Sequence, residues 1–340
     1  MKKLTHVVAL AGLATLAATT AQAGPTLDAI KARGQIICGV NTGLGGFALP
    51  DSAGNWTGID VDVCKAVAAA VFGDASKVKY VPTTAQQRFT AVQTGEVDLL
   101  SRNTTWTLTR DTQLGLNFTG VSYYDGQGFM VPKKLGVKSA KELNGATVCV
   151  QPGTTTELNL ADYFRANNMQ FKPVVIENLQ EVNAAFFSGR CDVYTTDASG
   201  LASIRKNDAP KGQSENYEVL PEIISKEPLG PVVRHGDDQW FDIVKWTLNA
   251  LIEAEEYGIT AANADKMAAE SKNPGIQRLL GTTAGNGKAI GLDEKWALNA
   301  IKSVGNYGEV WTRNIEPLGL PRGINNLWSK GGIMYAPPIR

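Results

Sequence analysis

The alternation of short apolar runs with helical stretches constrains the fold of this chain most. Three strand-length runs alternate with two helical stretches between residues 35 and 100, and the same order recurs between residues 146 and 194. Strand–helix–strand units place successive strands in a parallel sheet, so we predict two α/β lobes with mainly parallel sheets. Strands are expected at 35–40, 78–81, 97–100, 146–151, 171–176 and 191–194, and helices at 60–72, 86–94, 157–167 and 181–187.

The ends of these strands indicate where a ligand would bind. In open α/β sheets ligands sit beside the carboxyl ends of the strands, so we expect a site in the crevice between the lobes. The chain continues with an expected helix at 239–256. Residues 258–340 follow, with a helical pattern at 293–304 and a loop-rich end.

The N-terminus has the pattern of an export signal. Lys2 and Lys3 precede an apolar run from Val7 to Ala18, and small residues around Ala23 suit cleavage after that residue. The alternative is a membrane anchor, but the run is short for a bilayer and no other stretch approaches about 20 apolar residues. Cleavage would leave 317 of the 340 residues, enough for two domains. The export signal predicts a periplasmic protein.

Charge and motifs argue against several classes of partner. The full chain has 33 basic and 33 acidic residues; loss of Lys2 and Lys3 leaves 31 against 33, a net charge of −2. Without blocks of like charge, nucleic acid and anionic membranes are disfavoured. The sequence has no glycine-rich nucleotide fingerprint, no phosphate-loop lysine and no metal-ligand spacing, so we predict no cofactor and no metal.

Four cysteines remain after export, and an even number in an oxidising compartment favours two disulfides. Of three possible pairings, the simplest joins Cys38 to Cys64 and Cys149 to Cys191, within each half. The closed loops would contribute roughly 3.5 and 4 kcal/mol by chain entropy. The alternative is four reduced thiols packed as small core residues.

Three segments carry residues suited to bind a small charged ligand. Arg110 follows a threonine-rich loop and can grip a carboxylate through two parallel hydrogen bonds. The turn at 151–156 precedes a helix and presents free amide groups to an anion. Asp197 follows a strand and can pair with an ammonium group. Each also has a plain structural interpretation: an exposed arginine, a helix cap and a turn-forming aspartate.

The string Gly58-Ile59-Asp60-Val61-Asp62-Val63, with the helix after it, resembles the signature of amino-acid-binding proteins of ABC-type uptake systems (bacterial solute-binding protein family 3). Thr105, Thr107 and Arg110 also sit in the Thr-x-Thr-x-x-Arg frame of that family. The resemblance implies a two-lobed periplasmic-binding-protein fold of type II. Asp60 and Asp62 are expected to be scaffold rather than ligand contacts.

The resemblance also implies roles for individual residues. Arg110 and Thr105 would hold the α-carboxylate of an amino acid, and the Asn103 backbone would accept from its α-ammonium. Thr154 and Thr155, in the turn that starts at Gln151, would close on the carboxylate from the second lobe. Asp197 would bind the ammonium group.

The expected side-chain pocket is informative about ligand range. It would be formed by Asn41, Leu44 and Phe47 after the first strand and by Ala85 after the second. Leu44 stands where a stacking aromatic ring often sits in the family, and Ala85 is small. This favours many L-amino acids over one, and the long C-terminal extension and four cysteines resemble the general L-amino acid-binding subgroup.

By the same resemblance the chain crosses between lobes near residues 126–131 and 226–231. Lobe 1 would then comprise 24–127 and 229–340, with an extension from about 258, and lobe 2 would comprise 128–228. The resemblance further implies a monomer that closes on its ligand and delivers it to a membrane permease.

Two other classes compete with a transport function. Some proteins of this fold are periplasmic dehydratases or peptidoglycan-cleaving lyases, and Glu157 or Asp197 would be the candidate acid or base. The sequence offers little else: His235 is the only histidine after the signal, and the Gly-x-Ser-x-Gly elbow is absent. We therefore predict a binding protein rather than an enzyme. The second alternative is a sensor that presents its ligand to a receptor.

Overall fold

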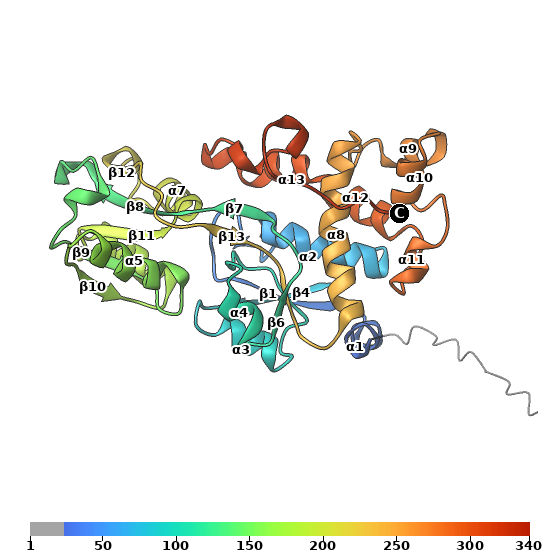
Figure 1. Ribbon diagram of the computed structural model, residues 1–340, viewed down its shortest axis with the longest axis horizontal. Coiled ribbons are helices and arrows are strands. Elements are labelled where there is room, and N and C mark those ends of the chain that lie inside the picture. The colour runs from blue at the N-terminus through green and yellow to red at the C-terminus, as the bar shows by residue number, and fades with distance from the viewer. Residues whose placement is uncertain (1–23) are drawn as a thin grey trace, which may run out of the picture.

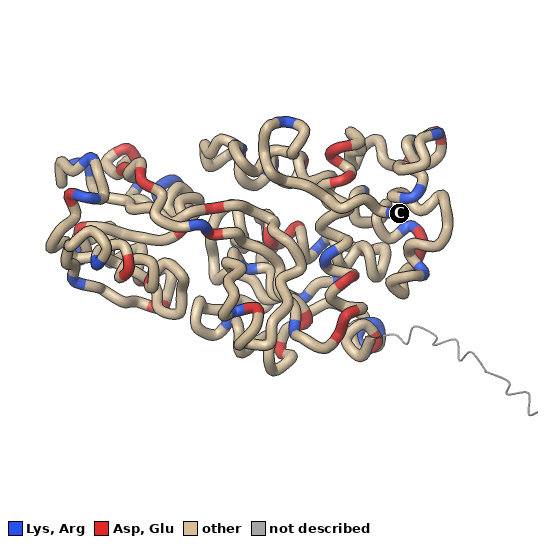
Figure 2. The backbone as a smooth tube through the Cα atoms, in the orientation of Figure 1, with Lys and Arg blue, Asp and Glu red and all other residues tan. Residues whose placement is uncertain are grey.

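The computed structural model describes residues 24–340, which form two α/β lobes joined by a narrow connection (Figure 1). The export signal predicted at residues 1–23 lies outside the described residues. Within 24–340, no helix combines the length and apolar character required to cross a membrane. Over this part of the chain, acidic and basic residues are interspersed rather than grouped by sign (Figure 2).

The two lobes contain sheets of the same topology, which confirms the predicted two-lobed α/β architecture. In each, the first three strands pair in parallel and the fourth is antiparallel to both of its neighbours. The first sheet has the order β4 (Val78–Thr83), β1 (Ile36–Asn41), β5 (Leu99–Leu100), β14 (Val232–Arg234), β6 (Leu116–Phe118). The second has the order β10 (Lys172–Val175), β9 (Thr147–Val150), β11 (Val193–Asp197), β8 (Gln127–Pro132), β12 (Tyr217–Val219).

The connection between the lobes is a pair of antiparallel strands, β7 (Tyr123–Asp125) and β13 (Glu227–Leu229). After β7 the chain enters the second sheet as β8, and after β13 it returns to the first sheet as β14. The reversed strand of each sheet is therefore the one that has just crossed. A short hairpin, β2 (Leu49–Pro50) with β3 (Trp56–Thr57), completes the strands of the described chain.

The helices begin and end where the sequence supplies caps. α2 (Ile59–Phe72) carries Asp60 and Asp62 in its first turn and ends at Gly73, whose φ of 70° is left-handed. Gly58 allows a close approach, because a Cβ there would lie 2.0 Å from the Phe47 carbonyl oxygen. The other α-helices are α1 (Pro25–Arg33), α3 (Arg88–Gln93), α4 (Leu108–Thr112), α5 (Thr155–Ala166), α6 (Leu179–Phe187), α7 (Ala198–Asn207), α8 (Asp238–Glu256), α9 (Ala264–Glu270), α10 (Pro274–Leu279), α11 (Asn286–Ala289), α12 (Trp296–Val304) and α13 (Tyr307–Asn314).

Both predicted disulfides form, Cys38–Cys64 and Cys149–Cys191, with Cα–Cα distances of 6.3 and 5.6 Å. The first ties β1 to α2 and the second ties β9 to the residues just before β11. The pairing within each half is confirmed, and the reduced-thiol alternative is wrong.

We call the lobe of the first sheet lobe 1 and that of the second sheet lobe 2. Residues 258–340, which we call the extension, pack mainly on lobe 1 (Figure 1). α12 lies against both α2 and α8, and α13 contacts the same two helices. Asp62 of α2 accepts hydrogen bonds from Arg313 and Asn314, both at 2.6 Å. Asp62 therefore anchors the extension, in agreement with its expected scaffold role.

Candidate functional site

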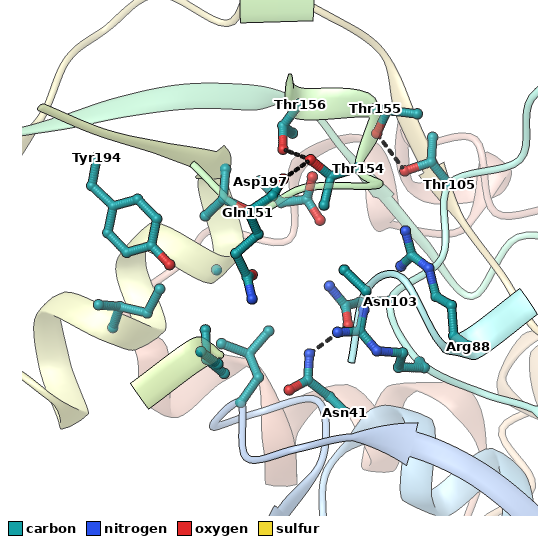
Figure 3. Close-up of a pocket in the computed structure, with 17 residues that line it drawn as sticks. Asn41, Arg88, Asn103, Thr105, Gln151, Thr154, Thr155, Thr156, Tyr194 and Asp197 are labelled. Atoms are coloured by element: carbon teal, nitrogen blue, oxygen red, sulfur yellow. Dashed lines mark hydrogen bonds between the residues drawn. The ribbon is translucent and has the colours of Figure 1, made fainter. Parts of the chain in front are cut away.

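A cavity lies between the lobes at the carboxyl ends of β1, β4, β5, β9 and β11 (Figure 3). It is partly open to solvent, and the empty space between its walls, open solvent included, is about 500 Å³. Residues of both lobes form its wall: Asn41, Leu44, Ala85, Arg88, Arg102, Asn103, Thr105, Gln151, Thr154, Thr155, Thr156, Leu179, Tyr194, Thr196, Asp197, Gly200 and Ile204.

Asn103 holds an unusual backbone conformation on the lobe 1 wall, with φ of 30°. Non-glycine residues at positive φ are uncommon and cluster at functional sites, and asparagine tolerates them best. The Asp60 carboxylate accepts from the Asn103 amide at 2.7 Å, and Asn41 Nδ2 donates to Asn103 Oδ1 at 3.0 Å. Asp60 is thus a buried support for the loop, as expected.

Three buried arginines give the lobe 1 side a positive character. Arg88 and Arg102 line the cavity, and Arg110 lies beside it. Burial lowers the pKa of Arg102 and of Arg110 to about 10, so these two remain cations at neutral pH, and burial lowers the pKa of Arg88 well below its usual value. Arg102 donates to the Thr83 carbonyl at 3.0 Å.

Arg88 and Arg110 connect the lobes through one atom. Each reaches the Gly153 carbonyl of lobe 2 at 3.5 Å, and each guanidinium lies over the Phe89 ring, 4.8 and 4.9 Å from its centroid. Arg110 also donates to the Thr105 carbonyl at 2.9 Å. These bonds hold the guanidinium groups side by side next to the second-lobe turn.

The second-lobe turn is built by helix capping. Thr154 Oγ1 accepts from the Glu157 amide at 3.0 Å and donates to the Gln151 carbonyl at 2.8 Å, so Thr154 caps α5. Gln151 Nε2 donates to the Glu177 carbonyl at 2.8 Å. Thr155 and Thr156, the first two residues of α5, also line the cavity, and their amides have no acceptor within the helix.

Glu227 of β13 joins three parts of the molecule. Its Oε2 accepts from Thr105 Oγ1 of lobe 1 at 2.6 Å and from Thr155 Oγ1 of lobe 2 at 2.7 Å. Its Oε1 accepts from Asn159 Nδ2 at 2.8 Å and from Ser225 Oγ at 2.6 Å. A single buried carboxylate therefore spans the cleft.

Asp197 ends β11 and is buried. Although it precedes α7, its side chain makes no capping bond within the described residues, so the carboxylate faces the cavity. Burial raises the pKa of Asp197 well above its usual value, with the nearby carboxylates of Asp125 and Glu227 adding to the effect; Arg88 and the Asn103 side chain act in the opposite direction. A bound cation would stabilise the ionised carboxylate and so offset the free-energy cost of its burial.

Most residues predicted from the sequence lie on this cavity. Those on the wall are Asn41, Leu44, Ala85, Asn103, Thr105, Gln151, Thr154, Thr155 and Asp197. Two do not line it: Arg110 is turned toward Thr105 and Gly153, and the Phe47 ring is buried against Tyr123, 5.5 Å between centroids. The Phe47 carbonyl accepts from the Asp60 amide at the start of α2, and its ring is buried in the core.

Sequence reasoning missed several wall residues and Glu227. Arg102 is the second residue after β5, so the rule of strand ends could have found it. Arg88 starts α3 after β4 and could have been found the same way. Tyr194 reads as an ordinary core position of β11, and Glu227, between Lys226 and Pro228, has no local pattern that marks it.

Known proteins are similar to this chain in sequence, and one solved structure is similar to it in fold. The chain is 63% identical over 338 residues to the general L-amino acid-binding periplasmic protein AapJ of Rhizobium johnstonii, covering 97% of each chain. It is 60% identical over 331 residues to the glutamate/glutamine/aspartate/asparagine-binding protein BztA of Rhodobacter capsulatus, covering 96% of this chain and 97% of that one.

The structure resembles an ABC transporter periplasmic binding protein from Brucella ovis with glutathione bound. The TM-score is 0.90 at 56% identity, covering 93% of this chain and 99% of that chain. The profile of bacterial extracellular solute-binding proteins, family 3, matches residues 36–262, two-thirds of the sequence. The chain therefore belongs to the bacterial extracellular solute-binding proteins of family 3.

Proposed function

We propose that this protein binds free L-amino acids in the periplasm and delivers them to the permease of an ABC transporter. The observation that carries the proposal is the charge pattern of the cavity. Asp197 faces it from lobe 2, and the buried arginines and Thr105 border it from lobe 1. This pattern is complementary to the ammonium and carboxylate of a zwitterion.

We assign the ends of the ligand as follows. Arg110, once it turns from the Thr105 and Gly153 carbonyls toward the cavity, and Thr105 hold the α-carboxylate, with the Thr154–Thr155 turn closing from lobe 2. Asp197 and the Asn103 backbone hold the α-ammonium. Asn41, Leu44 and Ala85 border the ligand side chain, and Phe47 supports their loop from the core.

A broad ligand range is the specificity that this pocket supports best. Leu44 and Ala85 provide an adaptable wall without a stacking aromatic ring. The relatives named for general L-amino acids and for four acidic and amide amino acids are consistent with this proposal.

Binding is coupled to closure of lobe 1 (24–127 with 229–340) on lobe 2 (128–228) about β7 and β13. The protein acts as a monomer and leaves its ligand unchanged. The similar proteins are solute-binding proteins rather than enzymes, which supports the absence of catalysis. Mass spectrometry of a ligand recovered after prolonged incubation, and light scattering for the monomer, test these two points.

Calorimetry with each of the twenty amino acids tests the proposal directly. We expect saturable binding of many of them, and Arg110→Ala should lose roughly 2–5 kcal/mol of binding free energy because it leaves a carboxylate without its partner. Arg165→Ala is the matched control, since that side chain is 78% exposed on α5. Binding of no amino acid would refute the function. Unchanged affinity in Arg110→Ala would shift the carboxylate to Arg88 and Arg102.

A further inference from the structure

The cavity has two chemically different ends. Arg88 and Tyr194 lie on opposite sides of it, and the Tyr194 hydroxyl points into the space near Gln151 (Figure 3). Apolar side chains that line the same cavity, Leu179 and Ile204, come from lobe 2 helices. The cavity therefore has a guanidinium on one side and an aromatic hydroxyl on the other, and apolar side chains are among the residues that line it.

Tyr194 is fixed in position, but its hydroxyl makes no hydrogen bond with the described part of the protein. The residue is fully buried, its strand pairs with both β9 and β8, and its ring packs against Phe186 at 5.8 Å between centroids. Among residues 24–340, its Oη is one of four buried side-chain atoms without a hydrogen-bond partner. Buried polar groups are nearly always hydrogen-bonded, so an exception that lines a ligand cavity points to the ligand as its partner.

The surroundings indicate what kind of group that hydroxyl would bind. Burial raises the pKa of Tyr194, so the phenol stays neutral and can both donate and accept a hydrogen bond. The charged group with the largest effect on it is Asp208, whose negative charge disfavours a second carboxylate there. An uncharged polar group, which can use both the donor and the acceptor, suits this position best.

The position along β11 fits a ligand side chain. Asp197 and Tyr194 are three residues apart on one strand, which separates their Cα atoms by about 10 Å. If Asp197 binds the α-ammonium, the space between these residues is where the side chain of an amino acid extends.

We propose that the Tyr194 hydroxyl is a specificity determinant that hydrogen-bonds the side-chain amide of glutamine or asparagine. This inference rests on the proposed amino-acid-binding function. It explains how one pocket can accept both apolar and amide side chains: the apolar ones contact Leu179 and Ile204, and the amides gain one directed bond.

The substitution Tyr194→Phe tests this assignment because it removes only the hydroxyl. We expect affinity for glutamine or asparagine to fall about fivefold to tenfold, the effect of one neutral hydrogen bond, while affinity for methionine and leucine changes less than about twofold. Tyr163→Phe is the matched control, since Tyr163 is a half-buried tyrosine of lobe 2 that does not line the cavity; all four affinities should stay unchanged.

The readout is the ratio of glutamine to methionine affinity measured by calorimetry on the same preparation. A general loss of folded protein affects the binding of both amino acids alike and leaves the ratio unchanged, so the ratio isolates the hydroxyl. An unchanged ratio in Tyr194→Phe, with wild-type protein still binding amino acids, would overturn this assignment alone. A wild-type protein that binds no amino acid would instead overturn the proposed function.

Discussion

The side-chain amide of Asn325 bonds both backbone groups of Tyr124 in the connecting strand β7. Asn325 Oδ1 accepts from the Tyr124 amide at 2.7 Å, and Asn325 Nδ2 donates to the Tyr124 carbonyl at 3.0 Å. Backbone amide and carbonyl groups alternate in direction along β7. Those of the residues on either side of Tyr124 point toward β13, so those of Tyr124 itself point toward the extension. Tyr307 adds a hydrogen bond to the Ser122 carbonyl at 2.7 Å. The extension therefore binds the connection along the side of β7 that does not face β13.

Removing this contact should weaken the connection between the lobes. Asn325→Ala leaves two backbone groups of Tyr124 without partners, and we expect a loss of about 1–3 kcal/mol in the free energy of unfolding. Urea denaturation measures this, and hydrogen exchange of a peptide covering β7 should become faster. Asn326→Ala changes the neighbouring, less buried asparagine and serves as the control. Equal stability of the two variants would contradict a specific role for Asn325.

Glu227 should control closure because Thr105 and Thr155, from different lobes, share its Oε2. Glu227→Gln keeps the size but replaces one acceptor oxygen by a donor and removes the charge. We expect amino-acid affinity to fall by about 1.5–3 kcal/mol, the contribution of hydrogen bonds to a charged group. Glu215→Gln, on the exposed surface of lobe 2, should bind normally.

A double-mutant cycle with Thr155→Val separates the bridge from general damage. If Glu227 acts through Thr155, the two losses in affinity are less than additive. Strict additivity would mean that Glu227 supports the fold without coupling the lobes.

Ligand affinity should depend on pH through Asp197. Burial and the neighbouring Asp125 and Glu227 raise the pKa of Asp197 in the free protein, and a bound ammonium favours the ionised form. Binding then releases a proton, and affinity falls as the pH drops below the raised pKa. Calorimetry in buffers of different ionisation enthalpy measures the released proton. Asp197→Asn should abolish most of this release and weaken amino acids more than their deaminated analogues; equal losses would contradict the ammonium role.

The sequence predicts the strand ends well because they are marked locally. An apolar run that stops at Asn41, or at the Gln151 turn, defines where a strand ends and hence where the cavity wall lies. Asp197 was found in the same way. These assignments need only the periodicity of single segments and the rule that binding occurs at the carboxyl ends of strands.

The remaining features depend on contacts between distant segments. Glu227 is important because residues 105 and 155 meet it, and Asn325 because Tyr124 lies beside it, which no local pattern reveals. The direction of the Phe47 side chain is likewise decided by packing against Tyr123. Short strands such as β7 and β13 carry too few residues for periodicity to be recognised.

Glu253 should make the stability of the protein fall with rising pH. This α8 residue is 5% exposed, and burial raises its pKa to about 7. The nearby Glu256 adds to the rise, whereas the hydrogen bond from the Ile339 amide and the charge of Arg278 lower the pKa. Because the folded-state pKa lies above the unfolded value, the native protein binds the extra proton. The stability from this group is present below about pH 4.5 and lost as the pH rises through about 7.

Glu253→Gln keeps an acceptor for the Ile339 amide and removes the ionisation. We therefore expect the variant to match wild type near pH 4.5 and to exceed it at about pH 8 by up to about 3 kcal/mol in the free energy of unfolding. Chemical denaturation at the two pH values measures the difference, with Glu270→Gln, an exposed residue of α9, as the control. A Glu253→Gln variant whose stability relative to wild type is the same at both pH values would show that Glu253 does not change its ionisation on folding, since only a shifted pKa links this side chain to the pH dependence.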